Sequence, residues 1–165
     1  MTLTIAIEPP RNPEIEELLR LGDEYMFSLY PAESCYLLDV SELERPAVTV
    51  FVGRDTAGRA LGMAALVEKA DGIAELKRMF VHEDARGQGL ASALMDRLEA
   101  AAADAGVQTI QLETGPLQHA AIALYEKRGF ARIPNFGPYV GDDFSVCYAK
   151  PLTAAVASAG VALPH

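Results

Sequence analysis

The chain has 165 residues, half of them apolar, and its 23 acidic and 14 basic residues give a formal net charge of −9. A disordered chain is excluded, because such chains combine low apolar content with high net charge. The length suits one domain with a hydrophobic core of ordinary size. A nucleic-acid partner is disfavoured, because a phosphate backbone repels an acidic protein, whereas a cationic substrate would be attracted.

The two cysteines, Cys35 and Cys147, lie far apart, and the sequence holds no CxxC or HxxxH cluster. We therefore expect no metal site, and two free thiols in a reducing compartment. Residues 1–13 lack the basic and apolar regions of a signal peptide, and no apolar run approaches the roughly 20 residues of a membrane helix. The sequence predicts a cytoplasmic protein without a membrane partner.

The first half of the chain is predicted to begin with a strand at 3–7 and a helix that starts at Asn12-Pro13. Apolar residues at helical spacing continue to about Tyr30, where Pro31 ends the helix. A short helix is expected around 37–43. Three β-prone segments separated by glycine-containing turns then predict antiparallel strands at 48–54, 60–68 and 73–81.

The second half is predicted to alternate helices with strands. Its expected elements are a helix over 89–105, a strand over 109–114, a helix over 118–128, a strand over 130–133, a Gly/Pro loop over 135–143 and a last strand over 144–152. Residues 153–165 show no core pattern and are expected to form a disordered tail. The predicted class is α/β, with a mixed, mostly antiparallel central sheet flanked by helices in a single domain over residues 1–152.

A glycine-rich loop, Arg86-Gly87-Gln88-Gly89-Leu90-Ala91, connects the third of these central strands to the long helix. Such a loop turns backbone amides inward at the positive end of a helix, which suits a phosphate or pyrophosphate, and Arg86 adds charge. A plain helix-entry turn would look similar. The loop is neither a P-loop nor a dinucleotide-binding fingerprint, because it lacks Gly-Lys-Ser/Thr and a third glycine.

Two blocks of the sequence resemble the GNAT (GCN5-related N-acetyltransferase) family. Residues 75–91 (ELKRMFVHEDARGQGLA) look like its pyrophosphate-loop motif, and residues 118–130 (QHAAIALYEKRGF) are similar to its second signature. The resemblance covers 48–152 well and the first 46 residues only in outline. It implies transfer of an acetyl group from acetyl-CoA, as co-substrate, to an amine by direct attack in a ternary complex. It also implies a homodimer, since the family often pairs subunits through a sheet edge.

Carried over by position, the resemblance assigns the pyrophosphate to Arg86 and to the amides of Gly87, Gln88, Gly89, Leu90 and Ala91. The pantetheine arm would pair with the backbone near Met79 and Val81, and the Val81 amide would polarise the thioester carbonyl. Tyr125 would protonate the leaving thiolate. Gln118 stands where the family usually has asparagine, so its contact with the arm is a departure from the pattern. Spacing alone favours a core aromatic at Tyr125, and only the family pattern makes a catalytic role the better interpretation.

A general base and an acceptor site complete the predicted chemistry. Glu75 and Glu113 are the candidates for the base, although Glu75 could instead form an ion pair with Lys69 or Lys77. Tyr30, Glu33 and Tyr139 are expected to line the acceptor site. Charge alone suggests a cationic amine, on a small molecule or a peptide. A CoA-binding module without catalysis and a binder of another nucleotide remain as alternative classes.

Overall fold

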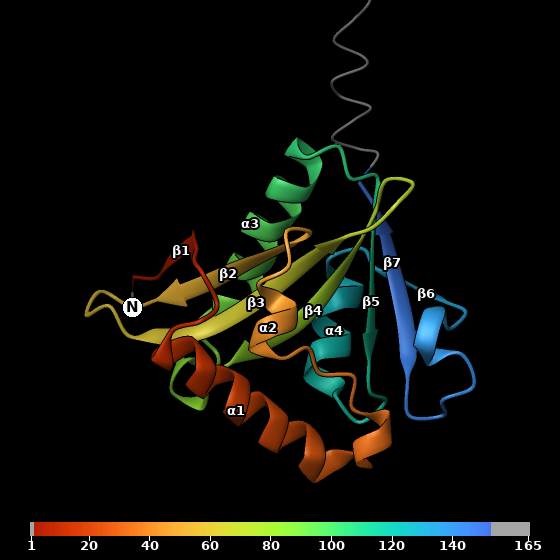
Figure 1. Ribbon diagram of the computed structural model, residues 1–165, viewed down its shortest axis with the longest axis horizontal. Coiled ribbons are helices and arrows are strands. Elements are labelled where there is room, and N and C mark those ends of the chain that lie inside the picture. The colour runs from red at the N-terminus through yellow and green to blue at the C-terminus, as the bar shows by residue number, and fades with distance from the viewer. Residues whose placement is uncertain (1, 153–165) are drawn as a thin grey trace, which may run out of the picture. The chain divides into compact units, whose positions relative to one another are not determined.

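The computed structural model describes residues 2–152, so the predicted tail at 153–165 lies outside the described residues. Within this range, seven strands follow the order β1-β2-β3-β4-β5-β7-β6, and four α-helices accompany them (Figure 1). The pairs β1/β2, β2/β3, β5/β7 and β6/β7 are antiparallel. This confirms the predicted α/β class with a mostly antiparallel sheet.

The described chain divides into two compact units. The first comprises the chain up to Val67 together with Leu76–Leu98, and the second comprises Glu68–Glu75 and the chain from Glu99 onward. Strand β4 (Ile73–Val81) and helix α3 (Leu90–Asp104) each run through both units. Within the described residues, no helix is long and apolar enough to cross a membrane.

The first unit holds the N-terminal helices and the central hairpin. Its elements are β1 (Thr4–Ile7), α1 (Pro13–Leu29), α2 (Val40–Leu43), β2 (Val48–Arg54) and most of β3 (Ala60–Glu68). Helix α1 starts as predicted, because the Asn12 side chain accepts a hydrogen bond from the Glu14 amide at 2.8 Å and Pro13 follows directly. Helix α2 is shorter than predicted and begins at a capping box of Asp39 and Glu42.

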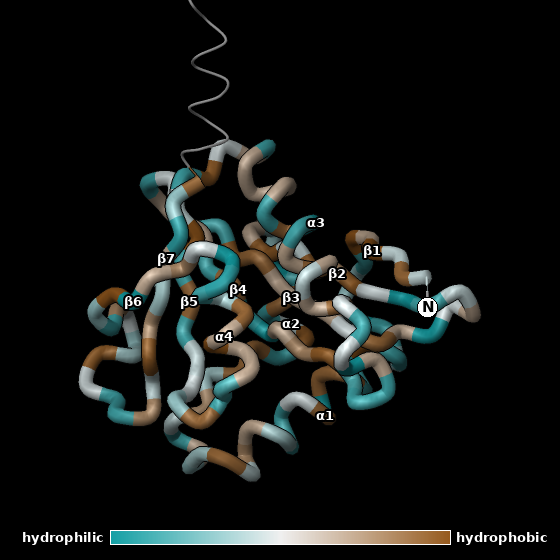
Figure 2. The backbone as a smooth tube through the Cα atoms, turned by 180° about the vertical axis from the view of Figure 1, so that it is seen from behind, coloured by the Kyte–Doolittle hydropathy of each residue, from teal (hydrophilic) through white to brown (hydrophobic). Residues whose placement is uncertain are grey.

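Different helices cover the two faces of the β2/β3 hairpin. On one face, α1 and α2 cover β2 and β3 in a cluster that comprises Ile15, Leu18, Leu19, Leu43, Val50, Val52, Ala60, Met63 and Ala65. Helix α1 is amphipathic, and its tube in Figure 2 accordingly carries both hydrophobic and hydrophilic segments. The other face is covered by the start of α3, which lies behind β2 in Figure 1.

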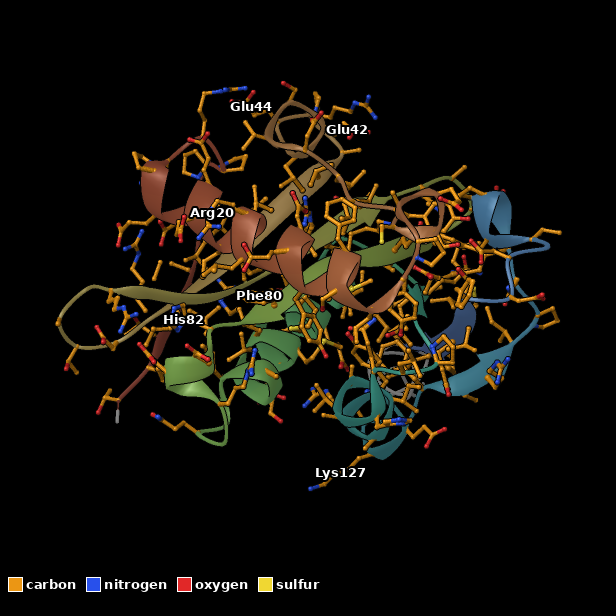
Figure 3. All side chains as sticks on the ribbon, turned by 90° about the horizontal axis from the view of Figure 1, so that it is seen from below. Arg20, Glu42, Glu44, Phe80, His82 and Lys127 are labelled. Atoms are coloured by element: carbon orange, nitrogen blue, oxygen red, sulfur yellow. The ribbon has the colours of Figure 1, made fainter. Side chains whose placement is uncertain are left out.

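The second unit is built around the C-terminal strands. Its elements are β5 (Thr109–Thr114), α4 (His119–Lys127), β6 (Ala131–Ile133) and β7 (Val146–Pro151), with the last strand inserted between the other two. The register pairs Leu112 with Tyr148 and Ala131 with Ala149. Glu99 ties this unit together, since it accepts from Arg128 at 3.0 Å and from Lys150 at 2.6 Å. Lys127 points away from α4 (Figure 3).

Candidate active site

The glycine-rich loop of the first unit presents its backbone at the surface. Gly87 and Gly89 have φ of 77° and 81°, in the left-handed region that glycine adopts most readily. A Cβ at either position would meet no other atom within 4 Å, so backbone conformation rather than packing favours glycine here. The loop residues 86–89 are exposed and lead directly into the 15-residue helix α3. This geometry suits an anion held by backbone amides at a helix N-terminus.

Two neighbouring glycines hold the start of α3 against the hairpin. Gly53 and Gly62 are cross-strand partners, and the side chain of Leu90, the first residue of α3, fills the space above both. A Cβ on Gly62 would lie 2.8 Å from Leu90 Cδ2 and 3.1 Å from the Phe80 carbonyl oxygen. The start of α3 therefore packs on two glycines that lie 37 and 28 residues before Leu90, and sequence reasoning missed this contact.

A 3-10 turn, Glu83–Ala85, precedes the loop and is capped by His82. His82 Nδ1 accepts a hydrogen bond from the Asp84 amide at 3.0 Å, and the His82 amide donates to the Leu61 carbonyl at 2.7 Å. Gln88 Nε2 donates to the Asp84 carbonyl at 3.2 Å. His82 is therefore a structural residue that fixes the end of β4 and the entrance to the loop.

Strand β4 carries an unusual backbone conformation at Arg78, whose φ is 57°. A non-glycine residue there costs about 1–3 kcal/mol, and such strain persists only when the surroundings enforce it. Arg78 directly precedes Met79, and both Met79 and Val81 are half-buried. A residue-type pattern carries no signal for this strain, because arginine is common in ordinary strands.

In the second unit, Tyr125 lies on α4 with its ring buried. The ring packs edge-to-face on Phe130 at a centroid distance of 5.8 Å, and the Phe130 amide donates to the Tyr125 carbonyl at 3.0 Å. Burial, and secondarily the carboxylate of Glu113, raise the pKa of the Tyr125 hydroxyl. Among residues 2–152, this hydroxyl makes no hydrogen bond, whereas those of Tyr139 and Tyr148 donate to Glu75 and Glu126.

Glu75 lies in a buried polar cluster of the same unit. Its exposed fraction is 5%, Lys69 Nζ lies 2.6 Å from Oε1, and the Tyr139 hydroxyl donates to Oε2 at 2.5 Å. The Lys69 ammonium also lies over the Phe136 ring, 5.2 Å from its centroid. Burial and the nearby Glu75 carboxylate raise the pKa of Tyr139. The structure thus shows the Lys69 ion pair and brings the predicted residues Glu75 and Tyr139 together.

Glu113 and Gln118 make more local contacts. The Ser145 hydroxyl donates to Glu113 Oε2 at 2.6 Å, and Cys147 is the cross-strand partner of Glu113. Burial is the first cause of the raised pKa of the Cys147 thiol. Gln118 Nε2 donates to the Thr114 hydroxyl at 3.1 Å, so its amide links the end of β5 to the start of α4. Sequence reasoning did not anticipate Ser145.

The remaining predicted acceptor residues belong to the first unit. Tyr30 ends α1 and is buried, and Glu33 is exposed in the 3-10 helix Ala32–Ser34 that follows. The structure does not group these two with the other predicted acceptor residue, Tyr139, within either unit. Their role in acceptor binding stays a prediction. Within the described residues, no three His, Cys, Asp or Glu side chains form a metal-binding group.

An exposed glycine loop at the start of a long helix, in a chain with a mostly antiparallel sheet, suits a co-substrate that carries phosphate groups. The sequence profile described as "Acetyltransferase (GNAT) family" matches residues 13–130. The chain therefore belongs to the GNAT acetyltransferase family. This confirms the resemblance that the two sequence blocks indicated.

Individual relatives cover almost the whole chain. An "IAA acetyltransferase" from Azospirillum brasilense is 41% identical over 151 residues, covering 91% of this chain and 98% of the relative. A Klebsiella pneumoniae structure assigned as an acyl-CoA N-acyltransferase is 34% identical with a TM-score of 0.78, covering 92% and 98%. The PaiA N-acetyltransferase of Thermoplasma acidophilum, solved with coenzyme A, is 15% identical with a TM-score of 0.74, covering 92% and 99%. The last likeness concerns the fold alone.

Proposed function

We propose that this GNAT acetyltransferase is an N-acetyltransferase that moves the acetyl group of acetyl-CoA to an amine by direct attack in a ternary complex. The observation that carries the proposal is the loop with left-handed Gly87 and Gly89 at the start of α3. Exposed amides at that helix end suit a diphosphate. The coenzyme A complex of the Thermoplasma fold relative supports the same ligand.

The first unit would bind the co-substrate. Arg86 and the amides of Gly87, Gln88, Gly89, Leu90 and Ala91 would hold the pyrophosphate, and the backbone at Met79 and Val81 would pair with the pantetheine arm. The Val81 amide would donate to the thioester oxygen as negative charge develops there. His82 supports this role, because its cap fixes the chain directly after Val81.

Tyr125 would act as the general acid. In the proposed reaction, the amine nitrogen bonds to the thioester carbon, the C–S bond breaks, and the departing thiolate takes the phenolic proton. The raised pKa of Tyr125 keeps the phenol protonated in the resting protein, as a general acid must be before it donates. Its hydroxyl is also unengaged by the rest of the described chain.

Glu113 fits the role of general base better than Glu75. Both oxygens of the buried Glu75 contact Lys69 and Tyr139, so a proton could be accepted only by giving up a contact. Glu113 is half-buried rather than buried, accepts from the Ser145 hydroxyl at Oε2, and lies within electrostatic reach of Tyr125. Glu113→Gln should therefore lower kcat more than Glu75→Gln does; the reverse order would contradict this assignment.

The acceptor is proposed to be an amine on a small molecule or a peptide. The direct test mixes the purified chain with acetyl-CoA and a panel containing a polyamine, an amino acid, an aminoglycoside, a peptide with a free N-terminus and the IAA named for the Azospirillum relative. We expect thiol release that depends on one of these, with mass spectrometry placing the acetyl group on nitrogen. Acetylation only at oxygen, or thiol release independent of every acceptor, would refute N-acetyl transfer.

A further inference from the structure

We propose that Arg78 is a positioning residue for acetyl transfer. This inference rests on the proposed function. The Arg78 guanidinium joins β4 to α1 and to the segment before α2, and so fixes the backbone that carries Met79 and Val81. Nothing in the two sequence signatures assigns a role to this side chain, because it lies between the residues that they single out.

The strained backbone is the first observation. Among residues 2–152, only Asp71 and Arg78 are non-glycine residues with positive φ. Asp71 lies in the turn between β3 and β4, where aspartate tolerates this conformation well. Arg78 lies inside a strand and has a long side chain, so the sequence offers no local reason for its φ of 57°. Tertiary contacts must therefore hold it.

The contacts of the guanidinium supply that restraint. Nε donates to the Leu38 carbonyl at 2.8 Å, and Nη1 lies 2.5 Å from Asp23 Oδ1 on α1. The Arg78 side chain is only 6% exposed, whereas that of Asp23 is 37% exposed. The guanidinium holds a hydrogen-bonded carbonyl and an ion-paired carboxylate at once through two different nitrogens, which an ammonium group reproduces poorly. Two separate segments of the first unit thus converge on one side chain of β4.

Arg78 lies on β4 directly before the backbone that is proposed to contact the thioester of acetyl-CoA. Beyond Arg78, Phe80 packs against the α1/α2 core cluster beneath α1 (Figure 3), and the His82 amide is bonded to Leu61. The stretch from Met79 to Val81 is therefore fixed at both ends, and Arg78 is the end that depends on a side chain. A displaced Val81 amide would align poorly with the thioester oxygen, although the rest of CoA could still bind.

A matched control lies in the same cavity. Arg78, Arg20, Asp23 and Cys35 are among the residues that line a cavity of about 480 Å³ in the first unit. Arg20 is also an ion-paired arginine, held by Glu17 and Glu24, but it is exposed on α1 and has an ordinary helical backbone. Removing Arg20 alters the charge of the cavity without touching β4.

The test compares Arg78→Ala with Arg20→Ala by calorimetry, kinetics and hydrogen exchange. For Arg78→Ala we expect kcat to fall about tenfold or more and the Kd of free CoA to rise by a clearly smaller factor. Free CoA keeps its pyrophosphate contacts with the glycine loop and lacks the thioester carbonyl, so only its pantetheine contacts weaken. The peptide over residues 76–82 should exchange faster. Arg20→Ala should leave all three quantities unchanged.

Other results separate the two proposals. A lower melting temperature of Arg78→Ala with unchanged kcat and unchanged exchange over 76–82 would overturn the positioning role. If wild-type protein binds no CoA, the proposed function fails, and the exchange comparison still decides whether Arg78 fixes β4. Should Arg78→Ala not fold, Asp23→Asn removes one anchor only, and it must then speed the exchange of 76–82 and lower kcat for the proposal to stand.

Discussion

Tyr125 has a packing role through its ring and a proposed catalytic role through its hydroxyl. Its ring is held by Phe130, while its hydroxyl is left without a partner among the described residues. Tyr125→Phe keeps the ring contact and removes only the acid. We therefore expect kcat to fall about 10²-fold or more, as for loss of a general acid, while calorimetry shows the Kd of CoA unchanged. Equal turnover by the variant would show that another group protonates the thiolate.

Tyr125, Gln118 and the loop residues could be predicted because they belong to two local sequence motifs. The spacing within each motif follows from the turn or helix that it forms. The ion pair of Glu75 with Lys69 was one of two pairings that strand geometry allowed, and the structure shows it. Arg78 and Ser145 escaped prediction, because their roles come from partners 32–55 residues away in sequence. Residue type alone does not report such partners.

Helix α3 follows the glycine loop directly, and its first residue, Leu90, packs on Gly53 and Gly62. Gly62→Ala would place a Cβ 2.8 Å from Leu90 Cδ2 and close to the fixed backbone of Phe80. We expect a loss of about 1–3 kcal/mol in the free energy of unfolding, measured in urea, because an overpacked core must shift. The Kd of acetyl-CoA should rise, since the start of α3 moves with Leu90.

Gly22→Ala on α1 is the control for that variant. Its Cβ would lie 3.6 Å from Phe80 and 3.7 Å from Arg78, which is ordinary contact. Alanine should instead stabilise the helix by roughly 0.5–1 kcal/mol. If Gly22→Ala lowered the free energy of unfolding as much as Gly62→Ala, that decrease would not be specific to the contact between Leu90 and Gly62.

Elements with strong local patterns were predictable, and those that depend on distant partners were not. The strands at 48–54, 60–68 and 73–81 have the predicted bounds, because alternating apolar residues and glycine turns delimit them. The 3-10 turns at 32–34, 83–85 and 137–139 lack such a pattern. The insertion of β7 between β5 and β6 also could not be predicted, because strand order depends on pairing across more than 30 residues.

At the scale of the whole molecule, three tyrosines couple stability to pH. Burial is the first cause of the raised pKa at Tyr125, Tyr139 and Tyr148. An unfolded tyrosine ionises near pH 10, so above about pH 10 the folded state binds more protons than the unfolded state. The free energy of unfolding should therefore be constant in this respect below pH 10 and fall as the pH rises further.

Urea unfolding between pH 8 and pH 11 measures that dependence. Tyr139→Phe removes one of the three groups and should make the alkaline fall shallower than in the wild type. A free energy of unfolding that stays level to pH 11 would contradict the raised pKa values.

The central claim is that the first unit binds acetyl-CoA through the glycine loop, and calorimetry of the purified chain with acetyl-CoA, free CoA and ATP tests it most directly. A Cβ at Gly89 would meet no protein atom within 4 Å. A glutamate there would add negative charge and strain the left-handed backbone, so Gly89→Glu should abolish ligand binding in a folded protein. We expect micromolar binding of both CoA species by the wild type, none by this variant, and no comparable binding of ATP. If the wild-type protein binds neither CoA species, or binds ATP instead, the glycine loop is not an acetyl-CoA site.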